Sequence, residues 1–170
     1  MPGGAPLPGL PVDVQLLGRN GQWKTLHQIK SDATGSFATN VRLAYNHALR
    51  ARFAGATGFG TTQSKPLTIG VRPRVGAQLA PSSAALVQRG GRVLVQGQVK
   101  PAKRYALLLV ERLRGGGRKR VGRRVVRVRS GKARASFLFA RRGSYVVRLA
   151  VLPDRKNLGG RSNAIALTVR

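Results

Sequence analysis

Hydrophobic and polar residues alternate with a period of two along much of the chain, and the spacing of an amphipathic helix is almost absent. In Pro11–Leu17, the residues Val12, Val14 and Leu16 fall on one face and polar residues fall on the other. The same alternation recurs in two later segments, Gly143–Val151 and Ile165–Val169. Because successive side chains of a strand point to opposite sides, these segments predict strands with one buried face.

Turn residues separate these strand-like segments. Gly18–Gly21 and Arg114–Gly117 are rich in glycine and favour hairpin loops that need positive φ. In Ser31–Gly35 the Asp32 carboxylate is placed to accept hydrogen bonds from nearby backbone N–H groups. Short strands at a spacing of roughly 8–12 residues indicate a β-sandwich or barrel.

The sequence also repeats itself. Three pairs of segments match at offsets near 97 residues: Leu49–Phe53 with Tyr145–Leu149 (offset 96), Ser64–Ile69 with Ser162–Leu167 (offset 98) and, loosely, Val12–Leu17 with Ala106–Glu111. A period of this length predicts two copies of one sandwich-sized unit. We therefore expect an all-β chain of two tandem antiparallel sandwich units, residues 1–72 and residues 73–170.

The two copies are expected to be unequal. Two candidate strands, Arg74–Ala80 and Arg92–Val99, precede the Tyr105 strand of the second unit. Only ten residues precede Pro11, so the first unit is expected to lack its opening two strands. Either the chain is a fragment of a longer modular protein, which we favour, or the first unit exposes open sheet edges.

Charge is high and uneven. The chain carries 32 lysines and arginines against four acids, a formal net charge of +28. Residues 71–170 hold 25 of the basic residues and two of the acids. Such a balance attracts polyanions, so nucleic acid, anionic cell-wall polymers and acidic lipid headgroups are the physical candidates. Because 24 of the basic residues are arginine, GC-rich codon usage is an alternative source of the excess, and the basic face then has no dedicated partner.

Some classes of site and segment are excluded by composition. The chain has no cysteine, which removes disulfides, thiol nucleophiles and thiolate zinc sites. No apolar stretch approaches the ~18 residues of a membrane helix. The first residues, Met1–Pro6, have neither a basic region nor an apolar core, so no export signal is visible.

Four short motifs follow one another in the first part of the chain: Pro8–Leu16, Gly21–Trp23, Ser31–Phe37 and Arg50–Gly55. Their succession resembles the bacterial immunoglobulin-like repeats of exported and cell-surface proteins from high-GC bacteria. Those repeats similarly run through a G-x-P-V-x-V strand, a G-x-W strand, a T-D-x-x-G-x-F hairpin and an R-x-R-F-x-G strand. The second unit matches more loosely, through Gly131, Gly143–Arg148 and Arg161–Asn163.

The resemblance implies immunoglobulin-like sandwiches and an extracellular or cell-surface location. It also implies a spacer, adhesion or wall-binding module that belongs to a longer modular protein, although a sandwich fold by itself does not define a function. Two features depart from the family pattern: the export signal is absent, and the charge of +28 exceeds what such repeats usually carry.

Two aromatic residues have structural interpretations. Tyr145 resembles the corner tyrosine that leads into strand F of immunoglobulin-like domains. Two residues further on, where antibody domains place a half-cystine, this chain has Val147, so apolar packing must replace the covalent link. Trp23, the only tryptophan, is expected in the core or half-buried rather than as an exposed stacking platform.

Patterns typical of catalysis are missing. A glycosidase needs two carboxylates within about 5–10 Å, whereas the four acids are scattered and Glu111 is most simply an outward residue in a local ion pair. His27 and His47 lack metal-ligand spacing and are interpreted as strand or turn residues. Gly115–Gly117 lacks the Gly-Lys-Ser/Thr of a phosphate loop, and no Gly-x-Ser-x-Gly elbow occurs. We predict no enzyme activity, no metal site and no cofactor.

Basic residues gather around the glycine-rich hairpin. Arg127 and Arg129 alternate with Val126 and Val128, which places these arginines on the solvent face of a strand. Guanidinium groups presented together can grip several anionic groups at once. The sequence therefore predicts a polyanion-binding surface made of Arg112, Arg114, Arg118, Lys119, Arg120, Arg123, Arg124, Arg127 and Arg129.

Two functions follow from these observations. The first is a non-catalytic spacer or adhesion module that holds an anionic cell-wall or surface polymer. The alternative is an intracellular β-domain that binds nucleic acid non-specifically through phosphate contacts. Single-strand recognition usually adds exposed aromatic residues. Alternation assigns the aromatics of the second unit largely to the core: Tyr105, Phe137, Phe139 and Tyr145.

Overall fold

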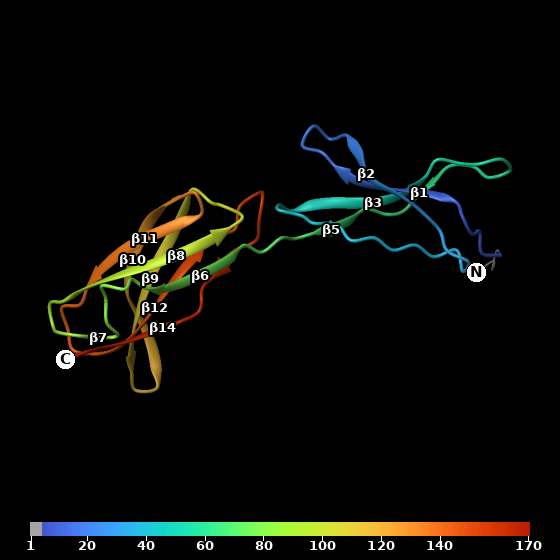
Figure 1. The fold of residues 1–170 in the computed structure, drawn as a ribbon. Helices are drawn as coiled ribbons and strands as arrows, with labels where there is room; N and C mark the ends of the chain where they lie inside the picture. Colours follow the sequence, from blue (N-terminus) through green and yellow to red (C-terminus); the bar gives the residue numbers. More distant parts are fainter. Residues whose placement is uncertain (1–4) are drawn as a thin grey trace. The chain divides into compact units, whose positions relative to one another are not determined.

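The structure is a computed structural model that describes residues 5–170. Within this range every regular element is a strand, so the all-β prediction is confirmed (Figure 1). Accordingly, residues 5–170 contain no helix long and apolar enough to cross a membrane. The chain divides into two compact units, Met1–Val71 and Arg72–Arg170.

The first unit is one antiparallel sheet. Its hydrogen-bonded order is β2-β1-β3-β4, and β5 also pairs with β3. The strand bounds are β1 Pro11–Leu17, β2 Trp23–Lys30, β3 His47–Phe53, β4 Thr62–Gln63 and β5 Leu67–Ile69.

The two faces of this sheet differ in polarity. Val12, Val14 and Leu49 are buried on one face, as alternation predicts. On the opposite face Arg50 donates from Nε to the Gln15 side chain at 2.9 Å, and its guanidinium lies 4.2 Å from the Trp23 ring centroid. Trp23 is half-buried, which confirms that prediction. The apolar face is therefore the one that a second layer would cover.

The segment after β2 differs from the hairpin that the resemblance implies. Hydrogen bonds from the Thr34 hydroxyl and from the backbone N–H groups of Ser36 and Thr34 hold the pKa of the Asp32 carboxyl below its ordinary value of 3.8. Gly35 completes this turn with φ +76°. Residues 36–43 then form no strand, so the expected hairpin has only its first strand. The reason is that no neighbouring strand in the described chain pairs with this segment.

The second unit is a β-sandwich. Its hydrogen-bonded order is β6-β8-β11-β10-β9-β12-β14-β7, with β13 beside β12. The bounds are β6 Arg74–Leu79, β7 Leu86–Val87, β8 Arg92–Lys100, β9 Tyr105–Arg114, β10 Gly117–Arg129, β11 Lys132–Leu138, β12 Gly143–Val151, β13 Gly160–Arg161 and β14 Ile165–Val169. All pairs are antiparallel except β7 with β14.

Strand β10 belongs to both layers of the sandwich. Gly117–Arg127 pair with β9, whereas Val128 and Arg129 pair with β11. The continuous ladder therefore folds at β10 into the layers β6-β8-β11 and β9-β12-β14-β7, which share one hydrophobic core. Within this core, a Cβ atom added to Gly97 of β8 would lie 2.2 Å from Leu149 Cδ1 of β12, so the layers approach closely there.

The corner tyrosine has its expected geometry. Tyr145 is 4% exposed, and its hydroxyl donates to the Arg141 carbonyl at 2.6 Å, four residues upstream. Its ring packs edge-on against Phe139, with 4.9 Å between ring centroids. Val147 is 1% exposed in the same core. Apolar packing thus occupies the position where antibody domains carry a half-cystine.

The two units repeat one strand arrangement. The pairs β1·β2, β1·β3, β3·β5 and β3·β4 correspond to β9·β10, β9·β12, β12·β14 and β12·β13. Residue pairs correspond at a shift of 98: Leu49↔Leu67 with Val147↔Ile165, and Arg52↔Gln63 with Ala150↔Arg161. The sequence offset of 96 for the β3 and β12 segments was therefore wrong by two residues. A two-residue slip keeps every side chain on its face, so alternation alone cannot detect it.

A serine makes the same hydrogen bonds in both units. Ser64 Oγ accepts from the Ala51 N–H at 3.0 Å, and the Ser64 N–H donates to the Ala51 carbonyl at 2.9 Å. Ser162 bonds to Leu149 in the same way, at 3.0 Å and 2.8 Å. Both hydroxyls donate to the carbonyl of the following residue. This shared geometry supports the predicted internal repeat.

Candidate polyanion-binding surface

The hairpin of β9 and β10 extends beyond the sandwich (Figure 1). β12 pairs with β9 only as far as Arg112, so residues 113–118 pair only with each other, and Lys119 pairs with Arg112. Gly115 and Gly116 close the hairpin at φ +53° and +78°, which L residues with a side chain rarely adopt. We call residues Arg112–Arg120 the arm.

Five exposed cations lie on or beside the arm. Their side chains are exposed and make no hydrogen bond or ion pair with any residue in the described part of the chain: Arg114, Arg118, Lys119, Arg120 and Arg123. Lys119 lies directly opposite Arg112 in the ladder, where like charges are destabilising. A bound anion would relieve this repulsion.

Arg112 is held inside the unit rather than presented to solvent. Its guanidinium lies 5.8 Å from the Tyr145 ring centroid and donates to the Arg142 carbonyl. Its Nε is buried without a hydrogen-bond partner among residues 5–170. Arg112 therefore braces the base of the arm more than it adds to an exposed surface.

Three other predicted residues lie towards the opposite end of β10. Arg124 donates to the Ser136 carbonyl at 3.1 Å, which directs it towards β11. Arg127 and Arg129 are exposed beside buried Val126 and Val128, as alternation predicts. The nine predicted residues thus divide into an arm group and a group near β11.

Two grooves flank the arm. The hairpin groove, about 420 Å³, brings Arg112, Arg114, Lys119 and Arg141 beside Phe137 and Tyr145. The outer-face groove, about 660 Å³, has an apolar floor of Leu107, Leu109 and Ala150, and its rim includes four arginines. These rim residues are Arg72, Arg120, Arg123 and Arg161. Arg120 lines both grooves and joins them.

Arg72 and Arg161 were not predicted, because they are distant from the hairpin in sequence. A signal for the outer-face groove was nevertheless present. Leu107 and Leu109 fall on the face opposite Leu108, and both are 8% exposed. A continuous apolar run such as Ala106–Val110 indicates a strand that is covered on both faces.

Carboxylates do not offset this positive charge. Glu111 forms an ion pair, as expected, but its partner is Arg148 of β12 at 3.1 Å rather than a residue close to it in sequence. Asp154 pairs with Lys103 at 2.8 Å. These two ion pairs engage both acids of the second unit.

The pKa of the Asp154 carboxyl is lowered by hydrogen bonds from its neighbours. The hydrogen bond from the Lys103 ammonium, supported by the backbone N–H groups of Asn157 and Lys156, holds the pKa of this carboxyl below its ordinary value of 3.8. Asp154 therefore remains ionised and occupied at neutral pH.

Histidines and carboxylates do not gather among the described residues. His27 and His47 lie in β2 and β3, as strand residues. Across residues 5–170 no three side chains of the histidine, cysteine or carboxylate kind come together as metal ligands. The chemistry that the second unit offers is positive charge in two shallow grooves.

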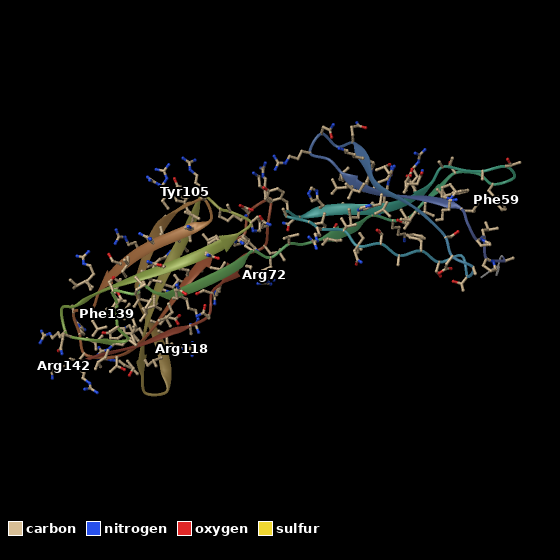
Figure 2. The ribbon with its side chains drawn as sticks, in the orientation of Figure 1. Phe59, Arg72, Tyr105, Arg118, Phe139 and Arg142 are labelled. Carbon is tan, nitrogen blue, oxygen red and sulfur yellow. The ribbon has the colours of Figure 1, made fainter. Side chains whose placement is uncertain are left out.

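Aromatic residues are mostly unavailable for stacking. Phe139 and Tyr145 are buried and Phe137 is half-buried, as predicted. Tyr105 is different: it is 48% exposed, with the Arg104 guanidinium 5.4 Å from its ring centroid, so its assignment to the core was wrong. It begins β9, and a strand end is open to solvent. Tyr105 and Arg118 lie at opposite ends of the hairpin (Figure 2).

No family model and no curated protein matches this sequence. Among solved structures, one similar chain is described as a "tetra-tandem repeat in extending region of large adhesion protein". The two chains are 12% identical, with a TM-score of 0.37. The alignment covers 96% of this chain and spans 43% of the length of that chain.

Proposed function

We propose that the chain is a non-catalytic spacer or adhesion module whose second unit binds anionic polymers of a cell wall or cell surface. The arm and the rim of the outer-face groove form the binding surface. The residues that carry it are Arg72, Arg114, Arg118, Lys119, Arg120, Arg123 and Arg161.

The observation that supports this proposal is uncompensated charge on a projecting element. The second unit has 25 basic residues, and its two acids are already engaged by Lys103 and Arg148. The exposed cations of the arm have no partner among the described residues. A flexible polyanion can therefore contact them from both sides of the ribbon, and each contact releases counterions.

The aromatic residues favour a polymer without bases. Non-specific single-strand binding combines a basic groove with aromatic side chains on which bases stack. Here the one exposed aromatic of the second unit, Tyr105, lies at the end of the hairpin away from the arm. Phosphate or carboxylate recognition needs only the cations.

A competition experiment tests the proposal. The protein is bound to purified cell wall at one fixed salt concentration, and duplex DNA is added as the competitor. The amount of DNA is chosen so that its phosphates equal the phosphate and carboxylate groups of the wall in number. We expect the wall to retain the protein under this condition. Preferential transfer to DNA would instead support the nucleic-acid alternative.

Matched variants separate a site from bulk charge. The arm variant replaces Arg114, Arg118, Lys119, Arg120 and Arg123 with serine. The control variant replaces five exposed cations elsewhere in the second unit with serine: Arg74, Lys100, Lys132, Arg155 and Arg170. Both lose five positive charges. We expect the arm variant to lose much more retention than the control variant. Equal losses would show that retention depends on net charge alone.

A further inference from the structure

The apolar face of the first unit is open where the equivalent face of the second unit is covered. Leu67 is 64% exposed, whereas Ile165, its counterpart at a shift of 98, is 9% exposed. Ala51 is half-buried, whereas its counterpart Leu149 is fully buried. The strand arrangement is the same in both units, so the difference comes from what lies on top.

A groove marks the open face. It has a volume of about 550 Å³, and its apolar lining includes Leu10, Val12, Phe37, Ala51 and Phe53. Thr62 and Ser64 also line it. The groove therefore follows β1, β3 and β4 on the side that the repeat assigns to a core.

The second unit shows what occupies this position. β6 and β8 lie there, and Gly97 of β8 packs directly on Leu149. At Gly160, the counterpart of Thr62, an added Cβ would meet the Pro73 carbonyl at 2.6 Å and Val75 at 3.2 Å. β6 and β8 thus cover the counterparts of the residues that line the groove of the first unit.

A segment whose backbone has no partner among the described residues borders the groove at Phe37. Residues 37–43 follow the turn at Gly35 as β11 follows the turn at Gly131, and both glycines have positive φ, +76° and +74°. β11 pairs along its whole length with β8. Residues 37–43 make no backbone hydrogen bond to any residue of the described chain. Seven successive residues are therefore free to pair with an incoming strand.

We propose that this groove is the docking site for a two-stranded β layer with the pattern of β6 and β8, supplied by a separate polypeptide segment. Its inner strand pairs with residues 37–43 and directs small apolar side chains onto Ala51 and Phe53. Main-chain hydrogen bonds and the alternate side chains that enter the groove together define such an interaction. This inference does not depend on the proposed polyanion binding.

A synthetic peptide with the sequence of Arg72–Lys100 tests the proposal on the full chain. We expect saturating peptide to slow amide hydrogen exchange of residues 37–43 at least about tenfold, equivalent to about 1.4 kcal/mol. A peptide with Val93→Asp and Val95→Asp should have no effect, because it lacks the apolar face. Unchanged exchange with the first peptide would overturn the proposal.

Two variants of the chain identify the face. Leu67→Glu places a charge on the open apolar face, and Thr68→Glu places the same charge on the opposite face of the same strand. Both positions are exposed, so both variants should fold. We expect Leu67→Glu to abolish the peptide effect and Thr68→Glu to preserve it; equal behaviour would refute the assignment. If the chain alone self-associates and Leu67→Glu removes this self-association, the occupant is a second copy of the chain. That result would overturn the proposal.

Discussion

Replacing Ser162 with alanine removes a buried hydroxyl that has an exposed counterpart in the other unit. Ser162 is 8% exposed, and its Oγ accepts the Leu149 N–H at 3.0 Å. In Ser162→Ala that N–H remains buried without a partner, which costs about 1–3 kcal/mol. For a unit of this size, 2 kcal/mol lowers Tm by roughly 8–16 °C. Ser64→Ala exposes the equivalent Ala51 N–H to water, so we expect a cost of at most about 1 kcal/mol.

Urea denaturation can follow the units separately. Trp23, the only tryptophan, reports the first unit by fluorescence, and far-UV circular dichroism reports both units. Ser144→Ala serves as the control, because Ser144 is exposed on β12 and its side chain makes no hydrogen bond to residues 5–170. It should change the free energy of unfolding by less than about 0.5 kcal/mol. A larger loss from Ser64→Ala than from Ser162→Ala would refute the reasoning from burial.

Three further predictions concern the second unit. Gly97→Ala should destabilise it by about 1–3 kcal/mol in urea denaturation, because the new Cβ meets Leu149; an unchanged midpoint contradicts this. Asp154→Asn should lower the free energy of unfolding at pH 7, because it removes the carboxylate that attracts Lys103. The difference from wild type should vanish as the pH falls from 3.8 through the lower folded-state pKa of Asp154, where the carboxyl becomes protonated. A difference that does not change with pH argues against the ion pair. On duplex DNA the arm variant should flatten the slope of log K against log salt by up to about 4.5, or ~0.9 for each lost cation, whereas an unchanged slope shows that the arm makes no phosphate contact.

Much of the fold could be predicted from alternation and turn chemistry. The bounds of β1 and β12 match the predicted segments, and Gly115 and Gly116 close the predicted hairpin. Tyr145 makes the expected corner hydrogen bond. These features depend on neighbours in sequence, which a pattern can describe.

Layer assignment could not be predicted in the same way. Alternation says which side chains share a face of β10, but not that its last residues leave one layer for the other. The same limit applies to the candidate site. Arg161 reaches the outer-face groove because β13 pairs with β12, and Glu111 finds Arg148 because β12 lies beside β9. Such contacts between distant residues depend on pairing register, which a single sequence does not reveal.

Val147 occupies the centre of a core that holds its two layers together without sulfur. No disulfide joins β9 or β12 to β8, and the chain has no thiol that an oxidant could modify. The stability of the sandwich therefore does not depend on disulfide formation or reduction. Its folding requires no disulfide-forming catalyst.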